Sequence, residues 1–213
     1  MSTIKQRAAV FAALGDPRRL EIAEELSRSD RTPGELVEKF EIGSALLAHH
    51  LDVLEVAGLI ERTESHADRR KRFVRLVDGY RIFIDGMVAP RRVTFVCRHN
   101  SARSQLAAAL WKSIVGTPAE SAGTEPATTV HRFAHKVAER HGLDMSSAVP
   151  RKFSLHAVRG ATVITVCDQS HDDLGRPLTR LHWSLPDPVA NGNLSAFETT
   201  YQDLVERITA FGK

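Results

Sequence analysis

Apolar residues recur at helical spacing in three successive segments near the start of the chain. The first predicts a helix over about 17–27, and Asp16-Pro17 before it is typical of an N-cap followed by proline. Thr32-Pro33-Gly34-Glu35 repeats that signal and predicts a second, short helix. The third is predicted to begin with Ser44 as its cap and to stop at Gly58. Two helices joined by a short turn predict a helix-turn-helix unit.

The third predicted helix has two unlike sides. Its apolar side is predicted to carry Leu46, Leu47, His50, Leu51, Leu54 and Ala57. Its solvent side begins with small and polar residues, which can approach base edges in a major groove: Ser44, Ala45, Ala48 and His49. His49 and His50 point about 100° apart on a helix and cannot readily share a metal ion. We therefore expect a DNA contact and a packed histidine.

Period-two alternation then replaces the helical pattern. Residues 59–63 and 72–77 alternate like two paired strands, with residues 65–71 as the loop between them. Four consecutive basic residues lie at the end of that loop: Arg69, Arg70, Lys71 and Arg72. Such a hairpin is a wing, and its cluster suits contacts to phosphate or to a minor groove, although runs of charge are also ordinary solvated surface.

Strand-like and helix-like segments alternate in the rest of the chain. Strands are predicted at residues 93–96, 120–126, 161–166 and 181–185, and helices at 105–115, from Thr128 or Thr129 to Gly142, and at 195–211. The β-branched run 161–166 is typical of a parallel strand buried on both faces. This predicts a three-layer α/β domain with a four-stranded parallel sheet, which binds ligands beyond the carboxyl ends of its strands.

With 213 residues, the chain is long enough for two domains, each with its own core. We predict a winged helix-turn-helix domain over 1–88, a linker over 89–92 and the α/β domain over 93–213.

The chain lacks an apolar run of membrane-spanning length and a signal-peptide pattern at its start, so we expect a cytoplasmic protein without membrane contact. Two cysteines fit a reducing compartment. The net charge of +3 is too small to indicate nucleic-acid binding by itself.

The segment between the predicted strand 93–96 and the following helix carries the chemistry. It reads Cys97-Arg98-His99-Asn100-Ser101-Ala102-Arg103-Ser104. In such a loop the backbone N–H groups and the helix N-terminus converge on one oxyanion, and their field favours a Cys97 thiolate. The Arg103 guanidinium can bind two oxygens of phosphate or arsenate, and Ser104 can hydrogen-bond the thiolate. The simpler alternative is a buried cysteine and a surface arginine.

Two phrases of the first domain are close to the usual wording of the ArsR-type winged-helix regulators: residues 13–20 and 48–54. This resemblance implies binding to a double-stranded DNA operator. It also implies a homodimer, which we expect to pair through residues 4–14 and 80–88. Many members of that family sense arsenite or soft metals through cysteines, but residues 1–96 contain none. A thiolate metal sensor in this domain is thereby excluded, and we predict no metal site; a site built from His and Asp or Glu is the alternative.

The loop Cys97–Ser104 resembles that of the low-molecular-weight tyrosine phosphatase and arsenate reductase superfamily, and the resemblance extends from about residue 91 to the C-terminus. It implies that Cys97 is the nucleophile and that residues 98–103 bind the oxyanion, with Asn100 ordering the loop and His99 at the rim. Asp187, which precedes Pro188, corresponds to the general acid. A turn-forming Asp-Pro pair is the plainer interpretation.

Two positions favour a reductase over a phosphatase. Gln105 follows Arg103-Ser104 where the phosphatases usually carry proline, and Val189-Ala190 stand where they place aromatic residues. Cys167 occupies the position of a second reductase cysteine, but Leu174 replaces the third. Cys167 is therefore either a catalytic thiol or an inert buried one, and we favour an external thiol, thioredoxin or a small molecule, as the reductant.

The sequence predicts an arsenic-responsive DNA-binding regulator fused to an arsenate reductase, with no bound cofactor. A phosphatase acting through a phosphocysteine is the first alternative. The second is a regulator whose α/β domain senses an oxyanion without catalysis.

Overall fold

The computed structural model describes residues 3–77, 80, 89–175 and 181–211. The chain divides into two compact units, Met1–Asp85 and Gly86–Lys213, each with its own hydrophobic core. The predicted boundary after residue 88 falls at the end of the segment 81–88, which lies outside the described residues. Each unit is described by itself below.

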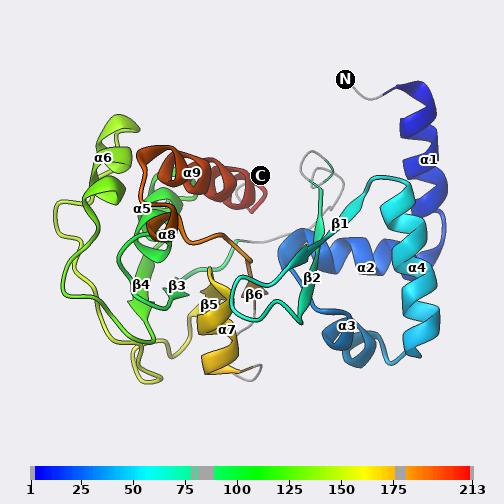
Figure 1. Cartoon of the computed structure of the whole chain (residues 1–213), viewed down its shortest axis with the longest axis horizontal. Coiled ribbons are helices and arrows are strands. Elements are labelled where there is room, and N and C mark those ends of the chain that lie inside the picture. Colours follow the sequence, from blue (N-terminus) through cyan, green and yellow to red (C-terminus); the bar gives the residue numbers. More distant parts are fainter. Residues whose placement is uncertain (1–2, 78–79, 81–88, 176–180, 212–213) are drawn as a thin grey trace. The chain divides into compact units, whose positions relative to one another are not determined.

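The first unit combines helices with one hairpin (Figure 1). Its elements are α1 (Ile4–Leu14), α2 (Pro17–Arg28), α3 (Pro33–Phe40), α4 (Ser44–Val56), β1 (Ile60–Glu64) and β2 (Arg72–Leu76). The two strands pair antiparallel, with Ile60 opposite Leu76 and Glu64 opposite Arg72. The predicted helix-turn-helix and wing are therefore both present.

The predicted caps of α2 and α3 are confirmed, because the side chains of Asp16 and Thr32 accept hydrogen bonds from the backbones of Arg19 and Glu35. The prediction that Ser44 caps α4 is wrong. Gly43 occupies the N-cap position of α4 and has no side chain to bond the first turn.

The prediction that Leu46 belongs to the buried side of α4 is also wrong. Its side chain is 50% exposed, whereas Leu47, Leu51 and Leu54 are buried. The apolar stripe of α4 is thus narrower than the sequence suggested, because only these leucines lie on the side that faces the core.

The second unit is built on a parallel sheet in the order β4-β3-β5-β6 (Figure 1). Its strands are β3 (Val93–Cys97), β4 (Ala119–Gly123), β5 (Thr162–Thr165) and β6 (Leu181–His182). Its helices are α5 (Arg103–Ile114), α6 (Arg132–Arg140), α7 (Asp168–Leu174), α8 (Pro188–Asn191) and α9 (Leu194–Thr209). The predicted four-stranded parallel sheet is confirmed.

Helices cover both faces of this sheet. α5 and α9 pack against each other on one face, while α7 contacts β3 and β5. Right-handed crossovers from β3 to β4 and from β5 to β6 run in opposite directions along the sheet, so they place α5 and α7 on opposite faces. Between the sheet and α5, Phe95 lies edge-on to Trp111 and 5.6 Å from the ring of Trp183.

In the second unit, α7 and α8 were not predicted, the strand predicted over 120–126 ends at Gly123, and two further elements have other bounds. The helix expected from Thr128 or Thr129 begins at Arg132, with His131 as its N-cap, because the backbone before it bonds to the loop after β3: Ala127 N–H donates to His99 O, and His131 N–H to Ser101 O. The strand expected over 181–185 ends at His182.

Among the residues that the structure describes, no helix is long and apolar enough to cross a membrane.

Candidate oxyanion site and nucleic-acid interface

The loop from Cys97 to Arg103 joins the carboxyl end of the buried strand β3 to the start of α5. The Ser104 hydroxyl lies 3.0 Å from Cys97 Sγ, and the Asn100 N–H donates to the same sulfur at 3.2 Å. Ala102, the N-cap of α5, provides no side-chain hydrogen bond to the helix. Within the described chain, the backbone N–H groups of residues 101–103 have no acceptor. They remain available to an oxyanion beside the sulfur.

Asn100 holds this loop in shape. It is fully buried and has a φ of 48°, a left-handed conformation that asparagine tolerates better than most residues. Its Nδ2 donates to Ser104 Oγ at 2.7 Å, while its Oδ1 accepts from Arg151 N–H at 2.8 Å and from Gln105 Nε2 at 3.2 Å. The predicted ordering of the loop by Asn100 thus has a direct hydrogen-bond basis.

Arg103 is buried, and its guanidinium is fixed at two points. Nη1 donates to Leu185 O at 2.9 Å, and Nη2 lies 3.3 Å from Asp187 Oδ2. The Asp187 carboxylate also accepts from Val189 N–H at 3.1 Å, as the N-cap of α8. The structure therefore brings Asp187 to the arginine of the loop, although the two residues are distant in sequence.

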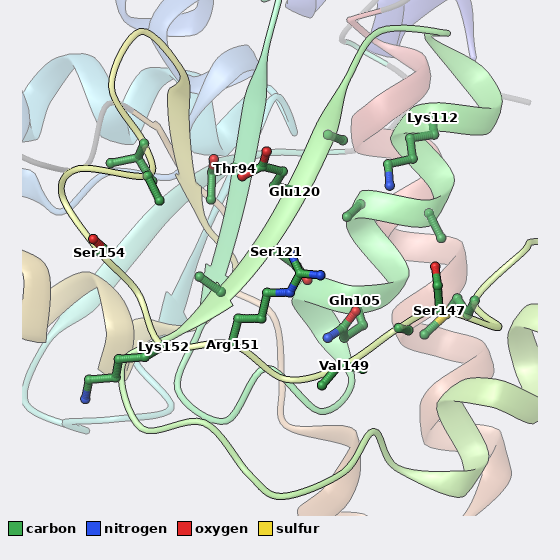
Figure 2. A pocket seen from close by; sticks show the side chains of 18 of the residues that line it. Thr94, Gln105, Lys112, Glu120, Ser121, Ser147, Val149, Arg151, Lys152 and Ser154 are labelled. Carbon is green, nitrogen blue, oxygen red and sulfur yellow. The ribbon is translucent and has the colours of Figure 1, made fainter.

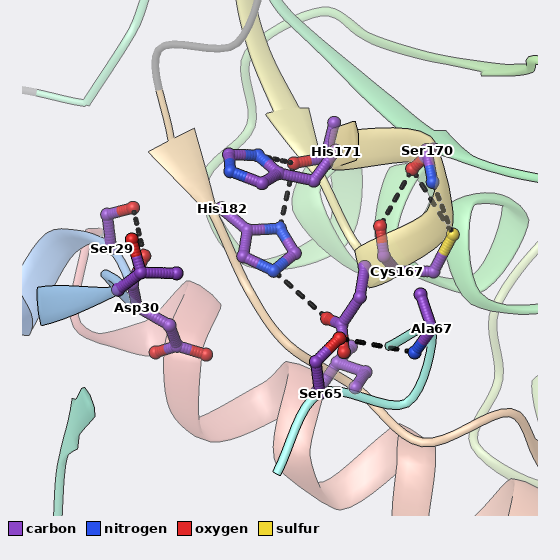
Figure 3. Close-up of polar contacts among 12 residues, drawn as sticks. Ser29, Asp30, Ser65, Ala67, Cys167, Ser170, His171 and His182 are labelled. Atoms are coloured by element: carbon purple, nitrogen blue, oxygen red, sulfur yellow. Dashed lines mark hydrogen bonds and ion pairs between the residues drawn. The ribbon is translucent and has the colours of Figure 1, made fainter. Parts of the chain in front are cut away.

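Cys167 lies directly behind the loop. It ends the β5 segment beside β3, and its sulfur accepts the backbone N–H of Arg98 at 3.2 Å. Ser170 N–H and Oγ lie 3.4 and 3.2 Å from the same sulfur (Figure 3). Burial raises the pKa of the Cys167 thiol, which opposes ionisation near neutral pH.

Arg98 was predicted to bind oxyanion, but its donors bond to other residues of the protein. Its N–H is committed to Cys167, and its guanidinium donates twice to Glu125 Oε2, at 2.8 and 2.9 Å. This ion pair raises the pKa of the Arg98 guanidinium. The His99 ring is exposed, and its Nδ1 lies 3.1 Å from Glu125 O. Both side chains thus fasten the loop to the turn after β4.

A buried polar chain flanks Cys167 on the α7 side (Figure 3). His182 Nε2 lies 3.1 Å from Asp168 Oδ1, and its Nδ1 lies 2.8 Å from Thr165 Oγ1. The His171 ring stacks on His182 at 4.2 Å. The contact between His182 and Asp168 fixes the first residue of α7 to β6.

Sequence reasoning missed Gly123. A Cβ at this position would lie 2.7 Å from Arg98 O and 3.0 Å from Asn100 Cβ, so only glycine lets β4 end against the loop. Reasoning from the sequence also missed Arg151, whose backbone bonds Asn100. A glycine within a predicted strand is a detectable signal of close backbone approach, whereas the arginine, distant in sequence, carries none.

In the first unit, the four residues predicted to face DNA from α4 are all exposed: Ser44, Ala45, Ala48 and His49. His50 is buried, as expected for a packed histidine, with its Nδ1 4.0 Å from Asp16 Oδ1. The N-terminal half of α4 therefore presents a surface of small and polar groups.

The wing also carries its basic cluster on the surface, since all four residues from Arg69 to Arg72 are exposed. Two of the guanidiniums already have acidic neighbours: Arg70 bonds Asp68 at 3.1 Å, and Arg72 lies 4.0 Å from Glu64. The Arg70 hydrogen bonds lower the pKa of Asp68. Arg69 forms no ion pair with any described residue.

Of the two segments expected to pair in a dimer, residues 4–14 form α1, whose Ile4 and Phe11 are 70% and 62% exposed. Residues 81–88 of the other segment lie outside the described residues. Across the part of the chain that is described, no three His, Cys, Asp or Glu side chains are grouped to hold a metal ion.

Comparison with known proteins matches the two parts of the chain to different families. Residues 92–213 match the family of low molecular weight phosphotyrosine protein phosphatases, and residues 16–62 match the bacterial regulatory proteins of the arsR family. An arsenate reductase of Bacillus cereus (strain 03BB102) is 31% identical over 131 residues, which cover 58% of this chain and 95% of that protein.

The first unit has its own relative. The transcriptional repressor SdpR of Bacillus subtilis is 39% identical over 51 residues, or 24% of this chain and 57% of the repressor. The tyrosine phosphatase AmsI of Erwinia amylovora has the fold of the second unit, with a TM-score of 0.51 at 21% identity over 61% of this chain and 95% of that structure.

These matches confirm both resemblances that the sequence predicted. The chain joins an ArsR-type helix-turn-helix to a phosphatase-like domain, and through residues 92–213 it belongs to the low molecular weight phosphotyrosine protein phosphatase family, which it shares with arsenate reductases.

Proposed function

We propose that the second unit reduces arsenate to arsenite through a covalent adduct on Cys97, and that the first unit is a DNA-binding regulator of an arsenic response. The observation that carries the enzymatic part is the loop itself. It holds the Cys97 sulfur, the Ser104 hydroxyl and the Arg103 guanidinium, together with the N–H groups of residues 101–103, which have no acceptor among the described residues. The similarity to arsenate reductases over this unit supports arsenate as the substrate.

In the proposed first step, the Cys97 thiolate attacks arsenic and forms a sulfur–arsenic bond. One arsenate oxygen leaves as water, with a proton donated by Asp187, whose carboxyl group is 3.3 Å from Arg103. Arg103 and the loop N–H groups bind the remaining oxygens, and the Ser104 hydroxyl stabilises the thiolate before attack.

In the second step, another thiolate attacks Cys97 Sγ. A disulfide forms, the sulfur–arsenic bond breaks, and its electron pair stays on arsenic, which leaves as trivalent arsenite. We infer that this thiolate comes from outside, from thioredoxin or a low-molecular-weight thiol, since burial raises the pKa of Cys167 and Leu174 stands in place of a further cysteine. A second external thiol then restores Cys97.

The alternative within the same site is phosphatase chemistry, in which Cys97 takes a phosphoryl group and water releases it. It is supported by the family of residues 92–213 and by the fold shared with a tyrosine phosphatase. A non-catalytic oxyanion sensor is the remaining alternative. Purified protein assayed in parallel for arsenate reduction with several thiol donors and for aryl phosphate hydrolysis separates the three.

For the first unit we propose a homodimer on a palindromic operator. The exposed start of α4 contacts base edges, while the wing cluster Arg69–Arg72 contacts the phosphate backbone. Exposed Ile4 and Phe11 on α1 support pairing through that helix. Equilibrium sedimentation tests the dimer, because a protein that remains monomeric at the concentrations used for DNA binding contradicts it.

A further inference from the structure

The edge strand β4 runs along a groove that the site above does not use (Figure 2). The groove encloses a cavity of about 230 Å³. On the α5 side it is lined by Ala108, Ala109 and Lys112, and elsewhere by Thr94 and the segment 144–158. None of the residues assigned to the oxyanion or to DNA lines it.

The backbone of β4 is open toward this groove. Pro118 O and Thr124 N–H bond to β3, so residues 120 and 122 face β3 as well, and residues 119, 121 and 123 face outward. Gly123 already uses its outward groups, because its N–H donates to Arg151 O and its O accepts from Phe153 N–H. The outward groups of Ala119 and Ser121 continue the same line, and no described residue pairs with them.

The groove extends over both faces of the sheet edge. Thr94, on β3, is opposite Glu120 and lies on the face away from α5, whereas Lys112 lies on α5 itself (Figure 2). An extended polypeptide lying beside β4 sends alternate side chains to the two faces and thus fills both halves of the groove. A compact small molecule reaches only one of them.

The groove contains polar groups that are available to bind a ligand. The Thr94 hydroxyl is buried, with 2% of the residue exposed, and it has no hydrogen-bond partner. The side chains of Lys112 and Arg151 form no ion pair with any described residue.

The groove carries more positive than negative charge. Of its two carboxylates, Glu120 pairs with Arg92 at 2.8 Å, and Asp144 accepts two bonds from Ser146 and also attracts Lys112. Three cationic side chains line the same groove, those of Lys112, Arg151 and Lys152, so its net charge is positive, which favours a ligand with carboxylates.

Exposed apolar side chains lie at the groove and next to its lining in the sequence. Val149, which lines the groove, is 57% exposed; Leu155, which follows the lining residue Ser154, is also 57% exposed, and Ile114 at the end of α5 is 38% exposed. Among the described residues of this unit, only Val189 is a further large hydrophobic residue with such exposure. Apolar surface beside an open strand edge is typical of a site for another polypeptide.

We propose that β4 is a docking site for an extended, acidic segment of a partner polypeptide, which adds as a fifth strand next to Ala119 and Ser121 and directs carboxylates to Lys112 and Arg151. This proposal is independent of whether the enzyme acts on arsenate or on phosphate esters.

The test uses full-length protein and an acetylated, fluorescent seven-residue peptide of alternating glutamate and valine. Its affinity is measured by fluorescence polarisation. Controls are the lysine–valine counterpart and a glutamate–valine peptide with N-methyl groups on the edge that bonds to β4. We expect binding of the acidic peptide alone, with NMR shifts at the amides of residues 119–123.

Variants of the protein test which residues bind the peptide. Lys112→Glu with Arg151→Glu is expected to weaken binding of the acidic peptide by at least about tenfold. Lys136→Glu, an exposed charge reversal on α6, is the matched control and is expected to leave it unchanged. Ser121→Pro removes one outward N–H and is expected to weaken binding, and the N-methylated peptide makes the same test on unaltered protein.

Three outcomes overturn the proposal. The first is failure of the acidic peptide to bind, and the second is equal binding of the N-methylated peptide. The third is a wild-type dimer that Arg151→Glu dissociates in sedimentation, because a second copy of the chain would then occupy the groove.

Discussion

The oxyanion loop and the wing are both short and rich in arginine, but their arginines are held in opposite ways. Arg103 is buried, and its guanidinium is fixed by Leu185 O and Asp187. Arg69 to Arg72 are exposed, and Arg70 and Arg72 lie against acidic residues of the same hairpin. A buried, bidentate group acts through its geometry, whereas exposed charges act through their number. Single substitutions should therefore abolish the chemistry of the loop but only weaken DNA binding by the wing.

The largest expected effect is that of Cys97→Ser. A serine hydroxyl ionises far less readily than a cysteine thiol and is the weaker nucleophile, so arsenate reduction and any phosphatase activity should both be abolished. Steady-state assays of both reactions measure this. Cys167→Ser is the matched control and should retain reduction if the second thiol is external.

Retained turnover in Cys97→Ser would exclude Cys97 as the nucleophile. Loss of reduction in Cys167→Ser would favour an internal relay over an external thiol. A Cys97–Cys167 disulfide found in high yield by mass spectrometry of arsenate-treated protein would do the same.

Loss of a buried polar pair should lower the free energy of unfolding more than loss of an exposed ion pair. His182→Ala removes the ring that lies 3.1 Å from Asp168 Oδ1 and is expected to lower the free energy of unfolding of the second unit by about 1–3 kcal/mol, because one buried polar contact is lost. Arg70→Ala removes an exposed pair in the wing and should change the free energy of unfolding little. Denaturant unfolding followed by tryptophan fluorescence suits the first variant, because Trp111 and Trp183 both lie in that core. Equal losses of unfolding free energy in the two variants would show that the buried contact contributes no more to stability than the exposed one.

Arg103→Lys should be severe although it conserves charge. An ammonium group cannot reproduce the planar fork that binds two oxygens, and we expect kcat/KM to fall by about 100-fold, roughly 2.7 kcal/mol. Kinetics with arsenate, together with direct titration of arsenate binding, measure this effect. Near-normal oxyanion affinity in this variant counts against the loop as the binding site.

The loop could be predicted from the sequence because its chemistry is local. A strand, a cysteine, an arginine six residues later and a helix are contiguous, so the spacing alone brings these groups together. Asp187 was found only through the resemblance. Its contact with Arg103 depends on the return of the chain after β6, which no local pattern encodes.

Contacts that depend on tertiary packing were missed. Gly123 is required by the close approach of two backbones, and the residues before α6 bond to the loop instead of forming a first helical turn. In the first unit, helical periodicity did not distinguish Leu46 from Leu47, since only packing decides which of two adjacent leucines faces the core.

In the wing, the contributions of the four basic residues to DNA affinity should be additive. Neutralising Arg69, Arg70, Lys71 and Arg72 together is expected to weaken binding to all DNA sequences and to reduce the salt slope by up to about 0.9 per lost phosphate contact. Binding isotherms at several salt concentrations measure this slope. A variant with unchanged affinity and salt dependence would show that the cluster is ordinary surface.

The smallest expected effect is on sequence preference. Changing Ser44 or His49 to alanine should alter the discrimination between operators by about 1–3 kcal/mol per lost base contact, with little change in the salt slope. Competition between related operator sequences measures the discrimination. A uniform loss of affinity for every sequence would assign these side chains to the phosphate backbone.

The central claim is that the Cys97 loop transfers electrons from thiols to arsenate. The most direct measurement is the amount of arsenite formed by the purified full-length protein with arsenate and thioredoxin or a small thiol, scored against thiol consumed. We predict one arsenite for each pair of thiols oxidised in the wild-type protein and none with Cys97→Ser. Hydrolysis of aryl phosphates by the same preparation, without arsenite formation from any thiol donor, would contradict the account.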